Sequence, residues 1–355
     1  MNKITIFYSL INREMSLLSL RDDEFFILFQ NSPLATINRL SRIHPRMRRL
    51  CQESRFRKLM EEKFIDCLVK KYGSKENALI HRIVKRNPTT VNLLLKYGVD
   101  PATENNLAII EASRYGYLEV VERLLEDSRV DPSVAYNWPI ILASQAGHLE
   151  VVNRLLEDPR VDATARNNEA IVQASGSGHL EVVNRLLDWR AFGPRSAVQD
   201  PRVDPSARDN KAIIIASARG HLEIVNRLLE DPRVDPSAQD NEAIINASNN
   251  LEIVKRLLQD PRVDPSAQDN EAIVFAVKGG HLEIVNRLLE DPRVDPTDQE
   301  NEAFDQASTR GYLDIVNRLL KDPRVVRLTR EQNDRAIILA RQNDHPEIIN
   351  LLIQQ

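Results

Sequence analysis

A phrase that returns with a period of 31 residues constrains this 355-residue chain more than any other feature. One half reads Asp-Asn-Glu-Ala-Ile-Ile-x-Ala-Ser, and the other reads Gly-His-Leu-Glu-Val/Ile-Val-Asn-Arg-Leu-Leu-Glu-Asp-Pro-Arg-Val-Asp-Pro. The leucine after Gly-His, or its equivalent, is Leu118, Leu149, Leu180, Leu222, Leu251, Leu282 and Leu313. The first alanine is Ala78, Ala108, Ala170, Ala212, Ala243, Ala272, Ala303 and Ala336, with Pro139 in one copy. Nine units of fixed period predict a solenoid, in which each unit stacks on its neighbours.

The first half of each unit is predicted to form a short helix. Asn241, Asn270 and Asn301 are expected as N-cap residues, because an asparagine side chain can accept a hydrogen bond from a free N–H there. The glutamate that follows each asparagine suits the positive end of the helix. A glycine such as Gly220 is expected to end the helix, since glycine enters the left-handed conformation at little cost.

The second half predicts another helix, as in residues 222–229, whose apolar residues form one wide stripe. Pro232 is expected to stop it, because proline donates no hydrogen bond and biases the preceding residue away from helix. Each buried Ile or Leu contributes roughly 1.5–3 kcal/mol, but two short helices cannot bury their own stripes. We therefore expect an all-α fold, a solenoid of stacked helical hairpins with a small helical N-terminal domain.

Residues 76–355 resemble the ankyrin family in the string Ala-Ser-x-x-Gly-His-Leu-Glu-Ile-Val-x-x-Leu-Leu. Glu-Ala-Ile-Ile replaces that family's Thr-Pro-Leu-His, although residues 138–141 keep the proline, and the usual hairpin tip is shortened to Gln-Asp-Asn. This short-period form is similar to arrays of large DNA viruses and their protist hosts. The resemblance implies nine ankyrin-like repeats that bind a protein, with no enzymatic activity and no cofactor.

A partner site is expected where the copies differ from one another, because residues under shared packing constraints stay the same. In ankyrin-like stacking the first helices line the concave side. Tyr115, Trp138 and Phe275 are costly to leave exposed, and aromatic residues with arginines are typical of binding hot spots. The alternative is neutral drift on an exposed surface. The candidate residues are Glu111, Arg114, Tyr115, Trp138, Leu142, Gln145, Gln173, Ile215, Arg219, Asn246, Phe275, Lys278, Gln306 and Arg310.

Between two of the units the spacing grows, and residues 188–199 form an inserted loop. Trp189 and Phe192 are apolar side chains with no core to fill there, which makes the loop a second candidate for binding. A tolerated surface insertion is the alternative interpretation.

The first 75 residues carry no repeat and resemble an F-box. The resemblance rests on an apolar helix that holds Phe25 and Phe26 and on a following helix with apolar residues at three-residue spacing. It implies contact with a Skp-family adaptor of a cullin–RING ubiquitin ligase through Leu20, Phe25, Phe26, Leu34, Ile37, Leu40, Ile43 and Leu50. A helical cap on the first repeat is the alternative, and the basic run from Arg39 to Lys58 leaves a phosphate contact as a third.

Charge and composition argue against several other classes of protein. The net charge is −4, which gives no general attraction to nucleic acid or to an anionic membrane. Two cysteines, and no secretory signal with a cleavage site, indicate an intracellular protein of the cytoplasm or nucleus that is not secreted. Most histidines recur at one slot of the repeat, so we expect them to be structural, with no metal site. We expect a monomer.

Overall fold

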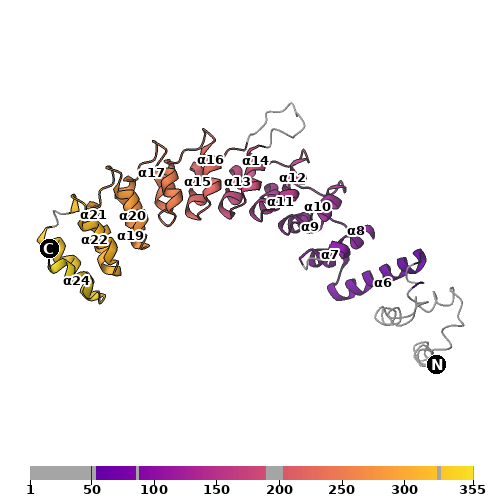
Figure 1. The fold of residues 1–355 in the computed structure, drawn as a ribbon. Helices are drawn as coiled ribbons and strands as arrows, with labels where there is room; N and C mark the ends of the chain where they lie inside the picture. Colours follow the sequence, from indigo (N-terminus) through magenta and orange to yellow (C-terminus); the bar gives the residue numbers. More distant parts are fainter. Residues whose placement is uncertain (1–48, 50–52, 85–87, 189–202, 326–328, 355) are drawn as a thin grey trace, which may run out of the picture. The chain divides into compact units, whose positions relative to one another are not determined.

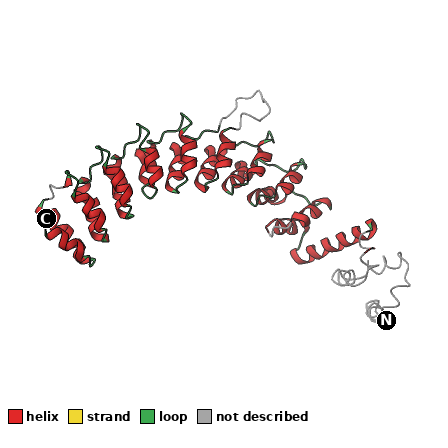
Figure 2. Ribbon diagram, in the orientation of Figure 1, coloured by secondary structure: helices red, strands yellow, loops and turns green. Residues whose placement is uncertain are grey.

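The computed structural model describes residues 49, 53–84, 88–188, 203–325 and 329–354 (Figure 1). These residues form helices and no strands, so the predicted all-α class is confirmed for the described part (Figure 2). None of the described helices is long and apolar enough to span a membrane.

The helices are given in chain order, in consecutive pairs from α9 on. They are α6 (Ser54–Tyr72), α7 (Lys75–Val84), α8 (Pro88–Lys96), α9 (Thr103–Arg114), α10 (Leu118–Leu125), α11 (Val134–Gln145), α12 (Leu149–Leu156), α13 (Ala165–Ser177), α14 (Leu180–Leu187), α15 (Ala207–Ala218), α16 (Leu222–Leu229), α17 (Ala238–Asn246), α18 (Leu251–Leu257), α19 (Ala267–Lys278), α20 (Leu282–Leu289), α21 (Asp298–Arg310), α22 (Leu313–Leu320), α23 (Arg330–Gln342) and α24 (Pro346–Ile353).

The chain divides into two compact units, and the N-terminal one comprises residues 1–112 with 119–130. In its described part, Leu68, Leu79 and Leu94 are fully buried. The carboxylate of Glu61 accepts hydrogen bonds from Lys96 Nζ (2.7 Å) and from the Tyr97 hydroxyl (3.0 Å), which fastens α6 to the end of α8. The Lys96 hydrogen bond lowers the pKa of Glu61, whereas burial and this carboxylate raise the pKa of Tyr97 to about 12.

The C-terminal unit comprises residues 113–118 and 131–355 and consists of stacked helix pairs. Neighbouring first helices pack on each other, as α11 does on α13 and α13 on α15, and neighbouring second helices do the same. Figure 1 shows these pairs side by side from α11 to α22. The side chains between them are small or aliphatic, such as Ala212, Ile213 and Val225, all fully buried. The core therefore runs along the stack as a repeated layer.

The turn between the two helices of a pair forms as the sequence predicts. Gly147 has a φ of +77°, and a Cβ atom there would lie 2.4 Å from the ring of His179 in the next pair. The Nε2 atom of His179 lies 3.1 Å from the carbonyl oxygen of Gln145, so this nitrogen carries the proton. His148, His221 and His345 make the same contact to the preceding pair. The recurring histidines thus join consecutive pairs.

The predicted N-cap role of the recurring asparagine is wrong. Gln239, Asp240 and Asn241 are all left-handed, with φ between 52° and 67°. The first residues of α17 therefore form a left-handed turn, and the right-handed helix begins after Asn241. The Asn241 side chain does not cap its own helix. Its Oδ1 accepts a 2.7 Å hydrogen bond from the backbone N–H of Asp264 in the next pair.

Four other pairs repeat this arrangement at the same slot. The bonds run from Asp162, Asp204, Asp235 and Asp295 to Asn137, Asn168, Asn210 and Asn270. Asparagine suits the slot because it tolerates the left-handed region and also supplies an acceptor.

The pair formed by α17 and α18 has lost the Gly-His turn, and a serine makes a bond there that its equivalents lack. Ser248 Oγ lies 3.0 Å from the carbonyl oxygen of Ala272 in the next pair and 2.6 Å from that of Ile245. At the same slot, Ser144, Ser175 and Ser217 have buried hydroxyls without a hydrogen-bond partner in the described structure.

Replacing these serines by alanine is expected to change the free energy of unfolding in opposite directions. Ser248→Ala removes the bond and should lower the free energy of unfolding by about 1 kcal/mol. Ser217→Ala removes an unsatisfied polar group and should raise it by up to about 1 kcal/mol. Urea unfolding of both variants measures the difference, and a loss of similar size in both would contradict the inter-pair bond of Ser248.

Candidate protein-binding surface

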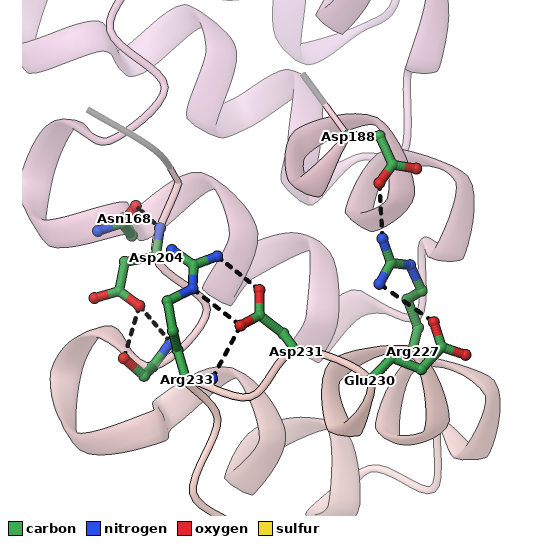
Figure 3. Close-up of polar contacts among 8 residues, drawn as sticks. Asn168, Asp188, Asp204, Arg227, Glu230, Asp231 and Arg233 are labelled. Atoms are coloured by element: carbon green, nitrogen blue, oxygen red, sulfur yellow. Dashed lines mark hydrogen bonds and ion pairs between the residues drawn. The ribbon is translucent and has the colours of Figure 1, made fainter. Parts of the chain in front are cut away.

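The charged residues of the connecting segments pair with one another (Figure 3). Arg233 donates two hydrogen bonds to Asp231, at 2.9 and 2.6 Å, and these lower the pKa of Asp231. One pair later, Arg262 Nη1 also donates to the carbonyl oxygen of Val234 at 2.9 Å, so the arginine joins two pairs. Arg293 and Arg324 repeat both contacts. These recurring carboxylates and guanidinium groups therefore hold the array together and are already occupied.

The arginine side chains on the outer side of the second helices are paired in a similar way. Arg227 binds Asp188 at 2.8 Å and Glu230 at 3.3 Å (Figure 3), and it donates to Asn184 of the preceding second helix at 3.0 Å. Arg185 and Arg256 make the equivalent bond to an asparagine one pair earlier. No group of three or more His, Cys, Asp or Glu residues that could hold a metal ion occurs in the described ranges.

The first helices present two parallel rows of side chains. We call these rows, together with the variable residues just before the turn glycine (Arg114, Tyr115, Gln145, Arg219, Lys278 and Arg310), the first-helix face. One row holds Trp138, Glu169, Lys211, Glu242, Glu271 and Glu302, and the other holds Leu142, Gln173, Ile215, Asn246, Phe275 and Gln306. Members of the two rows stand four residues apart on each helix and therefore point the same way. Gln173, for example, donates to Glu169 at 2.5 Å. This face carries the differences between the copies.

The structure corrects the sequence prediction at Leu142. Its side chain is only 6% exposed, because α11 packs on α13 and a branched apolar side chain at this slot lies against its neighbours. Ile215 is half-buried, and its Cδ1 would lie 2.9 Å from a Cβ atom on Gly176 of the preceding pair. Phe275 at the same slot is 45% exposed. Among these three apolar residues, only Phe275 offers much surface to a partner.

Trp138 is half-buried, and the guanidinium group of Arg166 lies 4.8 Å from its ring centroid. Pro139 follows it within the first right-handed turn, where a missing N–H costs nothing. Trp138 therefore offers a partner only a half-buried ring that an arginine already covers.

The remaining predicted residues lie near the ends of the first helices. Arg114 and Gln145 are exposed while their carbonyl groups accept the histidine contacts, and the ring of Tyr115 lies 6.0 Å from that of Tyr117. Three more residues of this set also have partners: Arg219 donates to the carbonyl of Gly176 at 2.8 Å, Lys278 lies 3.5 Å from Glu302, and Arg310 donates to Gln306. Glu111 is half-buried on α9 and belongs to the N-terminal unit.

Two predicted sites lie outside the described residues. They are the inserted loop with Trp189 and Phe192, and the F-box-like set Leu20, Phe25, Phe26, Leu34, Ile37, Leu40, Ile43 and Leu50. Both stay predictions from the sequence.

Sequence reasoning missed the second position of the left-handed turns. Asp209, Asp240, Asp269 and Glu300 occupy it with exposed side chains, and Tyr136 in the α11 pair is 78% exposed there. The signal available in the sequence was that Tyr136 replaces an acidic residue that recurs at this slot. The slot was interpreted as a shortened hairpin tip, so its side chains were not considered for binding.

Stacked helix pairs with a variable first-helix face define a helical-repeat binding protein. A family model described as ankyrin repeats, in three copies, matches residues 140–240 and 241–328, which is more than half of the chain. The chain therefore belongs to the ankyrin-repeat family and is a protein-binding repeat protein. No curated protein matches it.

Proposed function

We propose that this chain binds a partner protein through the first-helix face of its C-terminal unit. The observation that supports this most strongly is the contrast between slots. Connector and second-helix charges repeat from copy to copy and are paired within the array, whereas the first-helix rows vary and include the exposed Phe275. A variable and partly unsatisfied surface on a regular scaffold is typical of recognition.

The proposal extends to a specific role, recruitment of substrates to a cullin–RING ubiquitin ligase. In this role the F-box-like head, residues 1–75, binds a Skp-family adaptor while the repeats hold the substrate, inside the cell. The similarity to arrays of large DNA viruses and their protist hosts makes a host-cell protein the candidate substrate. The alternative is a scaffold or decoy whose head only caps the first repeat.

Removal of residues 1–60 tests the adaptor role. We expect the full chain to capture a recombinant Skp-family adaptor and the shortened chain to lose at least about nine-tenths of that capture, because the apolar contact residues are gone. The helical circular dichroism of the remaining repeats should persist. Unchanged adaptor capture by the shortened chain, or no capture by the full chain, would exclude the ligase role and leave repeat binding intact.

A further inference from the structure

One glutamate of the first-helix face, Glu271, has no polar partner among the described residues. Each equivalent glutamate has both an amide that donates a hydrogen bond and a nearby cation. Glu169, Glu242 and Glu302 accept a hydrogen bond from the amide four residues later, at 2.5, 3.3 and 3.0 Å. Each also has a nearby cation: Arg208 at 2.5 Å, Lys211 at 3.9 Å and Lys278 at 3.5 Å. Glu271 has neither kind of partner among the described residues.

The residue that deprives Glu271 of an amide is Phe275, which stands four residues later on α19. Its ring is 45% exposed and has the Lys278 ammonium 5.8 Å from its centroid. Phe275 therefore replaces an internal hydrogen bond with an exposed apolar surface beside a half-buried carboxylate. The change gives the isolated array little, since nearly half of the phenylalanine stays in water and the carboxylate gains no bond.

The surrounding repeats are negatively charged. Between α17 and α21 the first-helix row and the left-handed turns carry Asp240, Glu242, Asp269, Glu271, Glu300 and Glu302. Three of these carboxylates have a cation nearby: Lys211 lies 3.9 Å from Glu242, Arg335 lies 3.3 Å from Glu300, and Lys278 lies 3.5 Å from Glu302. The two preceding pairs carry more cations. Arg166 and Arg208 stand at the first position of the left-handed turn, where the later pairs have glutamine, and Lys211 replaces the glutamate of the row. Asp240, Asp269 and Glu271 have no ion-pair partner among the described residues, so an excess of negative charge near Phe275 favours a cation.

We infer that Glu271 and Phe275 form the centre of a site for a basic segment of a partner protein. A lysine or arginine of that segment pairs with Glu271, and an apolar side chain beside it covers the Phe275 ring. An anionic partner, or a neutral partner without a hydrogen-bond donor there, would desolvate Glu271 without compensation, which selects for the cation. This inference rests on the proposed function and specifies the partner.

A random peptide library displayed on phage and selected against the full chain tests the inference. We expect the enriched peptides to carry lysine or arginine next to an apolar residue. Synthetic copies should bind at least about tenfold more weakly to Glu271→Gln and to Phe275→Ala. Phe275→Gln should also abolish binding, because it gives Glu271 the amide partner found in α17 and α21. Glu283→Gln, an exposed carboxylate on α20 of the same pair, is the matched control and should bind normally.

The outcomes separate this inference from the proposed function. Enrichment of acidic peptides would overturn the basic-segment site and keep binding by the first-helix face. The same holds if the peptides bind Glu271→Gln with unchanged affinity but bind Tyr115→Ala or Arg219→Ala more weakly. Failure to enrich any basic peptide would also overturn the basic-segment site. Peptides whose affinity is unchanged by every substitution on the first-helix face would overturn both the basic-segment site and the proposed function.

Discussion

Asn241→Ala is expected to lower the free energy of unfolding by about 2–5 kcal/mol. The variant removes the acceptor of the Asp264 N–H, and an unsatisfied backbone donor costs about 1–3 kcal/mol. It also leaves alanine in the left-handed region at a φ of 67°, which costs roughly 1–2 kcal/mol. Urea unfolding measures the loss, and hydrogen exchange should show the Asp264 amide losing protection.

Two variants separate the contributions to this loss. Asp240→Ala alters a neighbouring left-handed residue with an exposed side chain, so it should show only the conformational cost. Asn241→Gly keeps the conformation accessible and removes only the acceptor. If Asn241→Ala were no more destabilising than Asp240→Ala, the asparagine bond would not join the pairs.

Asp305→Val is expected to stabilise the C-terminal repeats by about 3 kcal/mol at pH 7.5. Asp305 is 4% exposed at a slot where the other pairs have buried residues such as Ile245 and Val274. Burial raises its pKa to about 6 from 3.8, assisted by Glu302 and Glu300, although Arg335 lies 2.7 Å away and opposes the shift. A shift of this size corresponds to about 3 kcal/mol between the protonation states.

The sign of the pH dependence follows from the raised pKa. The folded state binds the Asp305 proton more tightly than the unfolded state, so this group costs nothing below pH 3.8 and destabilises increasingly as pH rises to about 6. The advantage of Asp305→Val should therefore be about 3 kcal/mol larger at pH 7.5 than at pH 3.5. Asp305→Asn, which is similar in size and does not titrate, should also flatten the pH dependence. An equal advantage of Asp305→Val at both pH values would refute the assignment.

The sequence predicted the parts of the fold that depend on local spacing. The helix at 222–229 and the turn at Gly220 follow from the apolar stripe and from glycine's freedom, and both are observed. The role of Asn241 could not be read from local spacing, because its partner lies in the next pair. Its recurrence at a helix start looked like a cap, although recurrence across pairs is equally the sign of a bond between them.

The site was harder to predict because exposure at one slot depends on the neighbouring copies. Leu142 and Phe275 occupy the same slot, yet one is 6% and the other 45% exposed. Glu271 was overlooked because its slot holds glutamate in most copies. Its lack of a partner follows from the residue four positions later and becomes visible only when contacts are compared across pairs.

The most direct test of protein binding by the first-helix face compares two triple variants against one partner. The partner is the protein that co-purifies with the full chain from its native cells, and isothermal titration measures its dissociation constant. Tyr115→Ala, Arg219→Ala and Phe275→Ala together should weaken binding at least about a hundredfold, with nearly unaltered circular dichroism and melting midpoint. Glu150→Ala, Glu223→Ala and Glu283→Ala, all exposed on second helices, should bind normally. Full affinity in the first triple variant, or loss only in the second, would contradict the first-helix face and direct the search to the Trp189–Phe192 loop.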